Sequence, residues 1–268
     1  MKKLSVLTLA LSVLLSVGCN EAKKKENEDK STEAVGVTDT IVTITPLKGS
    51  PEYPEATLTH GGGEVIEVEA GTVDFDFSVE NYELGAQTEN AEKNGLANSG
   101  KGQHIHFILD NGPYSAHYES EFSKDIEEGE HVLLAFLSRS YHEAVKNPTS
   151  FVVKKIVAGE PNEEQKMDVD FSAEHLFYSR PKGTYKGEGA KKVLLDFFLV
   201  GTEISPEGNK VKVRINDGDE FLIDKWAPHV IENMPMGENK IELVLVDENL
   251  EPIPGPFNAV TRTITLEE

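Results

Sequence analysis

An internal repeat constrains the fold of this chain more than any other feature of its sequence. Residues 102–112, GQHIHFILDNG, align without a gap on residues 208–218, GNKVKVRINDG. In both segments apolar residues occupy alternate positions, which is the period of a strand with one buried face, and a turn sequence follows. A gapless match of this kind indicates two copies of one structural module.

Further matches between the two halves follow in the same order along the chain. Throughout the chain, short runs of alternating apolar and polar residues are separated by Gly, Pro, Asn and Asp. This pattern is typical of β-sandwiches. We therefore predict an all-β fold of two tandem Ig-like β-sandwich modules, residues 40–159 and 166–268, joined by a polar linker. The predicted strands include 65–68, 73–79, 104–109, 132–137, 152–156, 193–200, 210–215, 240–246 and 260–266.

The repeat also predicts which side chains face each core. Successive side chains of a strand point to opposite faces, and the basic residues of 210–215 must face water, so the apolar ones point inward. The same faces then apply in the first module. An apolar outer face indicates a contact, either with the second module or a loop, or with a ligand or partner. The residues predicted to face outward are His104, His106, Ile108, Val132, Leu134 and Phe136.

Histidines gather in the first module. Of eight histidines in the chain, five lie between residues 104 and 142. His104 and His106 share one face about 7 Å apart along a strand, a separation that suits convergence on one metal ion. Imidazole favours Zn or Cu, and His117 or His142 could supply a third ligand. Two other interpretations remain open: structural or surface histidines, and recognition of a ligand without metal.

The segment around these histidines resembles a known group of proteins. The Gly-x-His-x-His pattern of 102–106, followed by Ser-Arg-Ser-Tyr-His-Glu at 138–143, resembles Bacteroidota lipoproteins built of tandem Ig-like modules. It is also similar to His-rich periplasmic domains of unknown function. The matching motif covers about residues 100–145. Some members of the group are automatically described as phosphopeptide-binding, but phosphate recognition favours Arg clusters and the motif holds only Arg139.

These observations give a candidate site on the first module. The alternation, the histidines and the motif together predict a ligand-binding surface with two loops beside an outer strand face. The residues of this surface are His104, His106, Ile108, Tyr114, His117, Phe136, Arg139, Tyr141 and His142. The candidate metal ligands among them are His104, His106, His117 and His142, with Zn or Cu as the ion.

The N-terminus is typical of a bacterial lipoprotein. A short basic stretch precedes the apolar run 4–17, which is too short to span a bilayer comfortably. The sequence Ser-Val-Gly-Cys ending at Cys19 resembles a lipobox, although Ser16 stands where Leu is usual. The resemblance implies cleavage before Cys19 and its acylation, which anchors a protein to a membrane. We predict a signal peptide over 1–18, a disordered tether over 19–39 and an envelope location, with the outer membrane favoured.

Charge and motifs argue against nucleic-acid binding and catalysis. The chain has 47 acidic and 26 basic residues, a formal net charge of −21 that repels nucleic acid. Nucleophile, metalloprotease, P-loop and dinucleotide motifs are missing from the sequence, and Asn216-Asp217-Gly218 is first a hairpin turn. We predict a non-catalytic, membrane-anchored binding protein whose ligand is a protein, a small molecule or a metal ion.

Two alternatives to that function stay open. One is a copper- or zinc-binding envelope protein that uses His104 and His106. The other is a structural or assembly subunit that uses the apolar outer face as a permanent interface.

Overall fold

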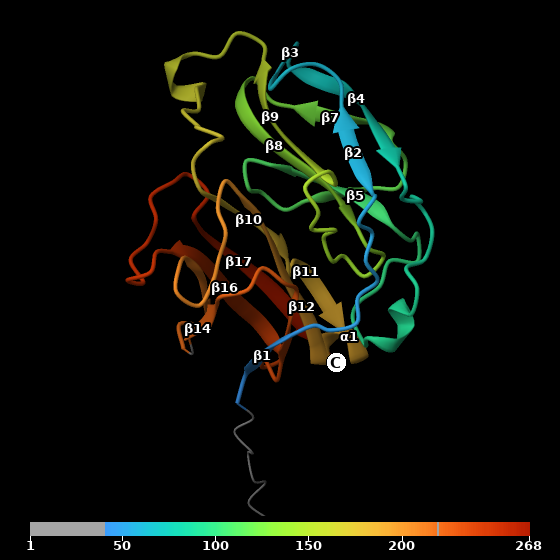
Figure 1. Cartoon of the computed structure of the whole chain (residues 1–268), viewed down its shortest axis with the longest axis vertical. Helices are drawn as coiled ribbons and strands as arrows, with labels where there is room; N and C mark the ends of the chain where they lie inside the picture. The colour runs from blue at the N-terminus through green and yellow to red at the C-terminus, as the bar shows by residue number, and fades with distance from the viewer. Residues whose placement is uncertain (1–40, 219) are drawn as a thin grey trace, which may run out of the picture. The chain divides into compact units, whose positions relative to one another are not determined.

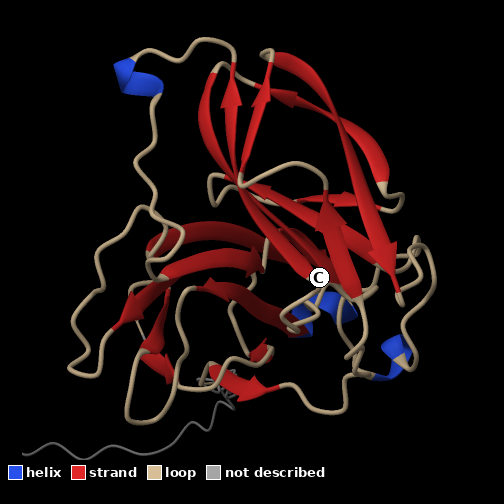
Figure 2. Cartoon of the chain, turned by 45° about the horizontal axis from the view of Figure 1, so that its top comes forward, coloured by secondary structure: helices blue, strands red, loops and turns tan. Residues whose placement is uncertain are grey.

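Strands make up nearly all of the regular structure. The structure is a computed structural model, and it describes residues 41–218 and 220–268. Within these residues the helices are three short turns, η1 (Ala91–Lys93), η2 (Glu163–Gln165) and α1 (Glu188–Lys191). Figure 2 shows the strands in red and the loops that join them in tan. The predicted all-β sandwich fold is confirmed.

The first sandwich consists of a three-stranded and a five-stranded sheet around their own core, which includes Phe75, Phe107 and Leu133. Alternation produces this core: in β4 the side chains of Val73, Phe75 and Phe77 are buried, whereas Asp74 and Asp76 are exposed. The smaller sheet has the order β2 (Thr57–His60), β4 (Gly71–Glu80), β7 (Glu121–Ile126). The larger has the order β3 (Val65–Val68), β9 (Phe151–Ala158), β8 (Gly129–Ser138), β5 (His104–Leu109), β6 (Ser115–His117).

The second sandwich consists of a four-stranded and a five-stranded sheet around a separate core. Its first sheet has the order β1 (Thr43–Pro46), β15 (His229–Glu232), β12 (Lys192–Val200), β10 (His175–Arg180). Its second has the order β11 (Gly183–Lys186), β17 (Ala259–Glu267), β16 (Gly237–Val246), β13 (Lys210–Ile215), β14 (Glu220–Ile223). Figure 1 colours its strands from gold through orange to red, apart from the blue β1.

The N-terminal strand departs from the module boundaries that the sequence predicts. Strand β1 lies inside the range 40–159 assigned to the first module, yet it pairs antiparallel with β15 of the second sandwich. The first sandwich therefore begins only after this strand. Backbone pairing and the packing of Val42 and Ile44 against the second core hold the segment there.

The faces predicted from the repeat are confirmed. Ile105 and Phe107 of β5 lie in the first core, and Val211 and Val213 of β13 lie in the second. The turns after β5 and β13 also correspond, because Asn111 and Asp217 occupy matching positions with φ of 54° and 57°. Two successive left-handed residues are typical of a tight hairpin turn. The turn that contains Asp217 joins β13 to β14, as predicted.

The outer faces of the two sandwiches pack against each other. Ile108 and Phe136 of the first sandwich share a buried apolar cluster with Phe177 and Phe198 of the second. The rings of Phe136 and Phe198 stack with centroids 5.0 Å apart. Of the contacts that the sequence left open for this apolar face, the one with the second sandwich is the one that forms. Residues 40–268 form one compact unit.

Two polar clamps cross this interface. The buried Asn111 side chain donates to the carbonyls of Leu176 and Phe257 at 3.0 and 3.1 Å and accepts from the amide of Tyr178 at 2.8 Å. Arg262 donates to the carbonyl of Asn111 at 3.0 Å. The Asn111 side chain thus supplies a hydrogen bond to each of three buried backbone groups that would otherwise have no partner.

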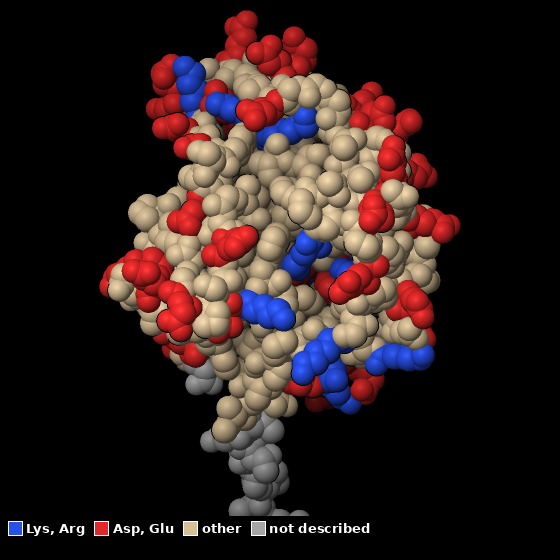
Figure 3. Space-filling model, in the orientation of Figure 1, with Lys and Arg blue, Asp and Glu red and all other residues tan. Residues whose placement is uncertain are grey.

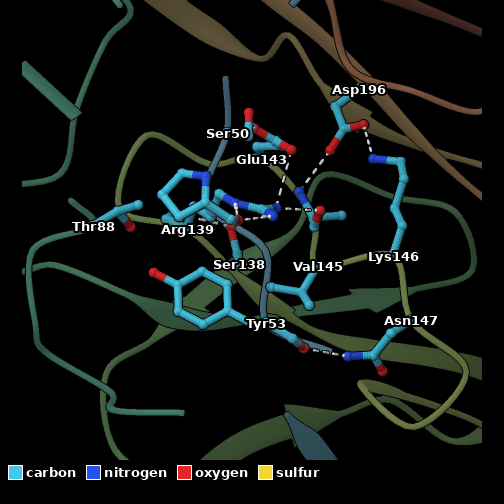
Figure 4. Close-up of polar contacts among 12 residues, drawn as sticks. Ser50, Tyr53, Thr88, Ser138, Arg139, Glu143, Val145, Lys146, Asn147 and Asp196 are labelled. Atoms are coloured by element: carbon cyan, nitrogen blue, oxygen red, sulfur yellow. Dashed lines mark hydrogen bonds and ion pairs between the residues drawn. The ribbon is translucent and has the colours of Figure 1, made fainter. Parts of the chain in front are cut away.

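The second clamp centres on Asp196 of β12, which is fully buried. Its carboxylate accepts from the amide of Ala144 at 2.7 Å and pairs with the Lys146 ammonium, as Figure 4 shows. In the same loop Arg139 pairs with Glu143 at 3.0 Å. The loop that follows β8 is therefore fixed against the second sandwich by buried charges.

Acidic side chains dominate the face shown in Figure 3, and basic ones lie on it in fewer, smaller groups. Within residues 41–218 and 220–268, no helix has the length and apolar character needed to cross a membrane. The predicted signal peptide, Cys19 and tether lie outside the described residues.

Candidate metal centre

Three histidines converge at the interface of the two sandwiches. Alternation along β5 turns His104 and His106 away from the first core, and His142 reaches them from the loop after β8. The Nε2 atom of His104 lies 2.9 Å from Nε2 of His106 and 3.1 Å from Nδ1 of His142. The three ligand nitrogens all lie within 4.8 Å of one another.

The loop 138–143 holds His142 in a strained conformation. His142 has a φ of 73°, in the left-handed region that costs a non-glycine residue about 1 kcal/mol or more. The amide of His142 donates to the carbonyl of Arg139, and the amide of Arg139 donates to the carbonyl of Glu143, both at 2.8 Å. The Arg139 guanidinium also donates to the carbonyls of Pro51 and Ala144. This network holds the strained backbone of His142 in place and directs its side chain toward β5.

A backbone contact sets the orientation of His104. Its Nδ1–H donates to the carbonyl of Gly102 at 2.8 Å, which leaves the Nε2 lone pair free to point at the cluster. Gly102 has a φ of 87°, and a Cβ there would lie 2.2 Å from the carbonyl oxygen of Gly85. Only glycine fits this position. Metal-binding histidines usually have such a second hydrogen bond.

The hydrogen bonds within the cluster depend on the tautomers of its histidines. His104 Nε2 has one in-plane lone pair, yet His106 Nε2 and His142 Nδ1 both lie within hydrogen-bond distance of it. His142 Nδ1 also lies 3.2 Å from the hydroxyl of Tyr114. If Tyr114 donates to His142, two lone pairs face each other at 3.1 Å. A metal ion between the nitrogens would satisfy all of the lone pairs together.

Burial keeps these rings neutral, which is the form that binds a metal. Desolvation lowers the pKa of His104 to about 4, with a smaller contribution from Arg180. Desolvation also lowers the pKa values of His106 and His142 well below the usual range, and Arg180 and Lys182 lower that of His142 further. At neutral pH all three side chains therefore offer uncharged imidazole nitrogens.

The spacing of the nitrogens is close to that of a tetrahedral site. Zn–N bonds of about 2.0–2.1 Å place two ligand nitrogens about 3.3 Å apart. The two observed distances from His104, 2.9 and 3.1 Å, differ from this value by a few tenths of an ångström, and the third pair of nitrogens, of His106 and His142, lies within 4.8 Å. Three nitrogen ligands leave one position open, and the buried ring of Tyr114 stacks on His106 with centroids 3.5 Å apart. The donor set suits Zn or Cu.

His117, which the sequence offered as a metal ligand, does not join the cluster. It pairs across the sheet with Ile105, so its side chain lies on the core face rather than on the face of His104. Its ring stacks on Phe122 at 3.5 Å, and its Nε2 lies 2.8 Å from the hydroxyl of Ser115. His142 is therefore the third histidine of the cluster.

The predicted exposed binding surface is wrong, because most of its residues are covered. The second sandwich lies over the outer strand face, and the loop 138–143 folds inward with its charges paired to each other. Of the nine residues of that surface, only His117 and His142 are partly exposed, and the buried ones are His104, His106, Ile108, Tyr114, Phe136, Arg139 and Tyr141.

A cleft of about 350 Å³ lies beside this loop, lined by Tyr53, Arg139, Lys146 and Trp226 among others. Its charged groups already bind one another: Arg139 pairs with Glu143, and Lys146 pairs with Asp196. The cleft therefore offers few free polar groups to a ligand, in contrast to the histidine cluster.

The second sandwich contributes residues that the sequence pattern did not reveal. Ser179 of β10 lies 3.2 Å from Nδ1 of His106, and Arg180 and Lys182 follow it. Strand β10 has apolar and polar residues buried alike, so it shows no alternation from which it could be recognised.

The depressed pKa values predict a specific acid sensitivity. Between pH 6.5 and pH 4 the unfolded chain binds a proton at residue 104 and the folded chain does not, so the free energy of unfolding falls as pH falls. We expect His104 to contribute about 2 kcal/mol of this loss between pH 6.5 and pH 5. Urea unfolding in the presence of a chelator measures it. If the free energy of unfolding of a His104→Gln variant fell with pH as steeply as that of wild type, the lowered pKa of His104 would be contradicted.

Comparisons with known proteins give only distant similarities. No protein-family model matches this chain, and no curated protein matches it. Among solved structures it is similar to the fibronectin(III)-like modules of Clostridium thermocellum CbhA, at 11% identity over 85% of this chain and 94% of that one, with a TM-score of 0.27. It is also similar to two fibronectin type-III domains of chicken tenascin, at 7% identity over 78% and 98%, with a TM-score of 0.21.

A third similarity is to SGBP-B of the Bacteroides ovatus mixed-linkage glucan utilization locus, solved with a mixed-linkage heptasaccharide. The identity is 10% over 85% of this chain, the TM-score is 0.23, and this chain spans 48% of that protein. TM-scores this low assign neither a family nor a function.

Proposed function

We propose that this protein is a non-catalytic metal-binding protein of the bacterial envelope. Its ligands are His104, His106 and His142, and its ion is Zn or Cu. The observation that carries the proposal is the convergence of three neutral imidazole nitrogens within 4.8 Å, two of them on buried residues and the third on the partly buried His142. The predicted binding role is kept, but its ligand is an ion inside the protein rather than a partner on its surface.

The comparison of the two modules supports this proposal. In the second module, lysines 210 and 212 occupy the positions of His104 and His106, and both are half-buried. The sandwich scaffold therefore folds without histidines on this strand. Burying three imidazoles desolvates polar groups, which a fold retains where they gain a compensating interaction. Binding an ion provides such an interaction.

A thermal melt with added metal tests the proposal. An ion that binds only the folded state raises its stability by about 4 kcal/mol at a thousandfold excess over the dissociation constant. We expect Zn²⁺ or Cu²⁺ to raise the melting temperature of the wild type and to leave His142→Gln nearly unchanged. His142 is the best choice for substitution because it is only partly buried and lies in a loop.

His60→Gln provides the matched control, since His60 lies outside the cluster and its Nδ1 contacts only the neighbouring carbonyl of Gly61. It should retain the full metal response. A wild type that shows no shift with either ion, or a His142→Gln variant that keeps the shift, would refute the proposed site.

We also propose that the protein is anchored to a membrane by lipid on Cys19. The lipobox-like sequence and the polar segment after it support this location. Cys19→Ser should move the protein from the membrane fraction to the soluble fraction. Labelling cells with a fatty-acid analogue checks the anchor directly, and an unlabelled wild type that is secreted normally would exclude it.

A further inference from the structure

Two basic side chains lie beside the histidine cluster, around the ring of Tyr114. The Lys182 ammonium lies 4.1 Å from the centroid of that ring and donates to the Tyr114 carbonyl at 2.6 Å. The Arg180 guanidinium carbon lies 5.2 Å from the same centroid. Because His106 stacks on the ring at 3.5 Å, it covers one face, and Lys182 must cover the other. One aromatic ring therefore separates a proposed metal ligand from an ammonium group.

Neither of these charges has a carboxylate partner among the residues that the structure describes. Arg180 is 7% exposed, its Nη1 donates to the hydroxyl of Tyr185 at 2.9 Å, and its buried Nε has no hydrogen-bond partner. Nearby Arg262 contacts only carbonyls and the ring of Tyr178. An uncompensated charge in such surroundings is costly in free energy. It is also unexpected in a chain with 47 acidic residues.

A metal ion at the cluster would make this imbalance larger. Its three protein ligands are neutral imidazoles, so they cancel none of its charge. An ion with three protein ligands has an open coordination position. An anion at that position would neutralise both the ion and the two basic side chains.

We propose that the metal centre binds a small carboxylate or inorganic oxyanion, held by the ion and by Arg180, while the charge of Lys182 attracts the anion from the other face of the Tyr114 ring. This inference rests on the proposed function and names the second ligand of the same site. A guanidinium is suited to oxyanions because its planar N–H groups match two oxygens of one anion. The protein then binds a metal and an anion as a coupled pair, and each raises the affinity of the other.

Co²⁺ replaces Zn²⁺ as a visible probe in the experiment, with acetate and phosphate as the two anions. We expect either anion to change the absorption spectrum of Co²⁺-loaded protein and to raise its Co²⁺ affinity roughly tenfold. A response to acetate alone identifies a carboxylate ligand, a response to phosphate alone identifies an inorganic oxyanion, and both support the proposal.

Substitution of Lys182 gives a second readout, because the affinity for Co²⁺ should rise while the response to anions falls. Lys182→Gln should bind Co²⁺ several-fold more tightly than wild type when no coordinating anion is present, because a repelling charge is removed. Its anion response should also be weaker than that of wild type. A loss of structure would weaken Co²⁺ binding instead. Arg180→Lys, which keeps the charge but not the planar fork, should retain normal Co²⁺ affinity and respond less to anions.

Lys186→Gln is the matched control. Lys186 lies at the end of β11, is largely exposed and already pairs with Glu267 at 2.7 Å, so its removal should change neither property. Co²⁺ binding that is indifferent to both anions, with Lys182→Gln no tighter than wild type, would overturn the inference and leave the metal site standing. A wild type that binds no Co²⁺ in any buffer would overturn the metal site as well.

Discussion

Replacing Asn111 by Ala should lower the free energy of unfolding by about 3 kcal/mol or more. The substitution leaves the carbonyls of Leu176 and Phe257 and the amide of Tyr178 without partners at a buried position. Each buried polar group left unsatisfied costs about 1–3 kcal/mol. The effect is large because one amide side chain serves three backbone groups of the other sandwich. Chemical unfolding of the variant measures the loss.

The repeat supplies the control for this experiment. Asp217 holds the matching turn position with nearly the same φ, 57° against 54°, but its side chain is exposed. Asp217→Ala therefore carries the same backbone strain without the loss of a clamp. We expect it to change stability by less than about 1 kcal/mol. Equal losses for the two variants would show that the turn conformation, rather than the interface, determines the effect of Asn111.

Asp196→Asn should destabilise the protein by about 3–5 kcal/mol, because it leaves the Lys146 ammonium at the interface without its charge partner. The Asp196 carboxylate is fully buried and also accepts from the amide of Ala144. The asparagine keeps the shape of the side chain, so the loss measures charge rather than packing. Thermal and urea unfolding should agree on its size.

A second substitution separates the ion pair from the rest of the interface. When Lys146→Met is added to Asp196→Asn, no unpaired charge remains, and replacing a buried pair in this way is often nearly neutral. We expect the double variant to recover at least half of the loss. A double variant as unstable as the sum of its single variants would mean that Asp196 and Lys146 act independently, against the contact between them.

The repeat predicted the faces of the strands correctly, and the physical reason is simple. Lysines 210 and 212 can only face water, so the gapless match determined that His104 and His106 point away from the first core. It also placed Phe136 on the outer face, where its ring stacks on that of Phe198. Alternation is a property of one strand, and it can therefore be read from a single sequence.

The sequence left open whether the second module, a loop, or a ligand or partner covers that face, because the answer depends on how two sandwiches dock. A strand pattern shows that Phe136 leaves its own core but not whether water, a ligand or another sheet meets it. His117 and His142 were equal candidates for a third ligand, since both lie in or beside turns. The pairing of His117 with Ile105 and the left-handed backbone of His142 separate them, and both depend on tertiary structure.

The most direct test of the metal centre is X-ray diffraction from crystals grown with Zn²⁺, recorded on both sides of the zinc absorption edge. We predict one strong anomalous peak about 2.0–2.1 Å from Nε2 of His104, Nε2 of His106 and Nδ1 of His142. Cu²⁺-grown crystals should show the peak at the same position. No peak between these three nitrogens at saturating metal, or peaks only at surface carboxylates, would contradict the account.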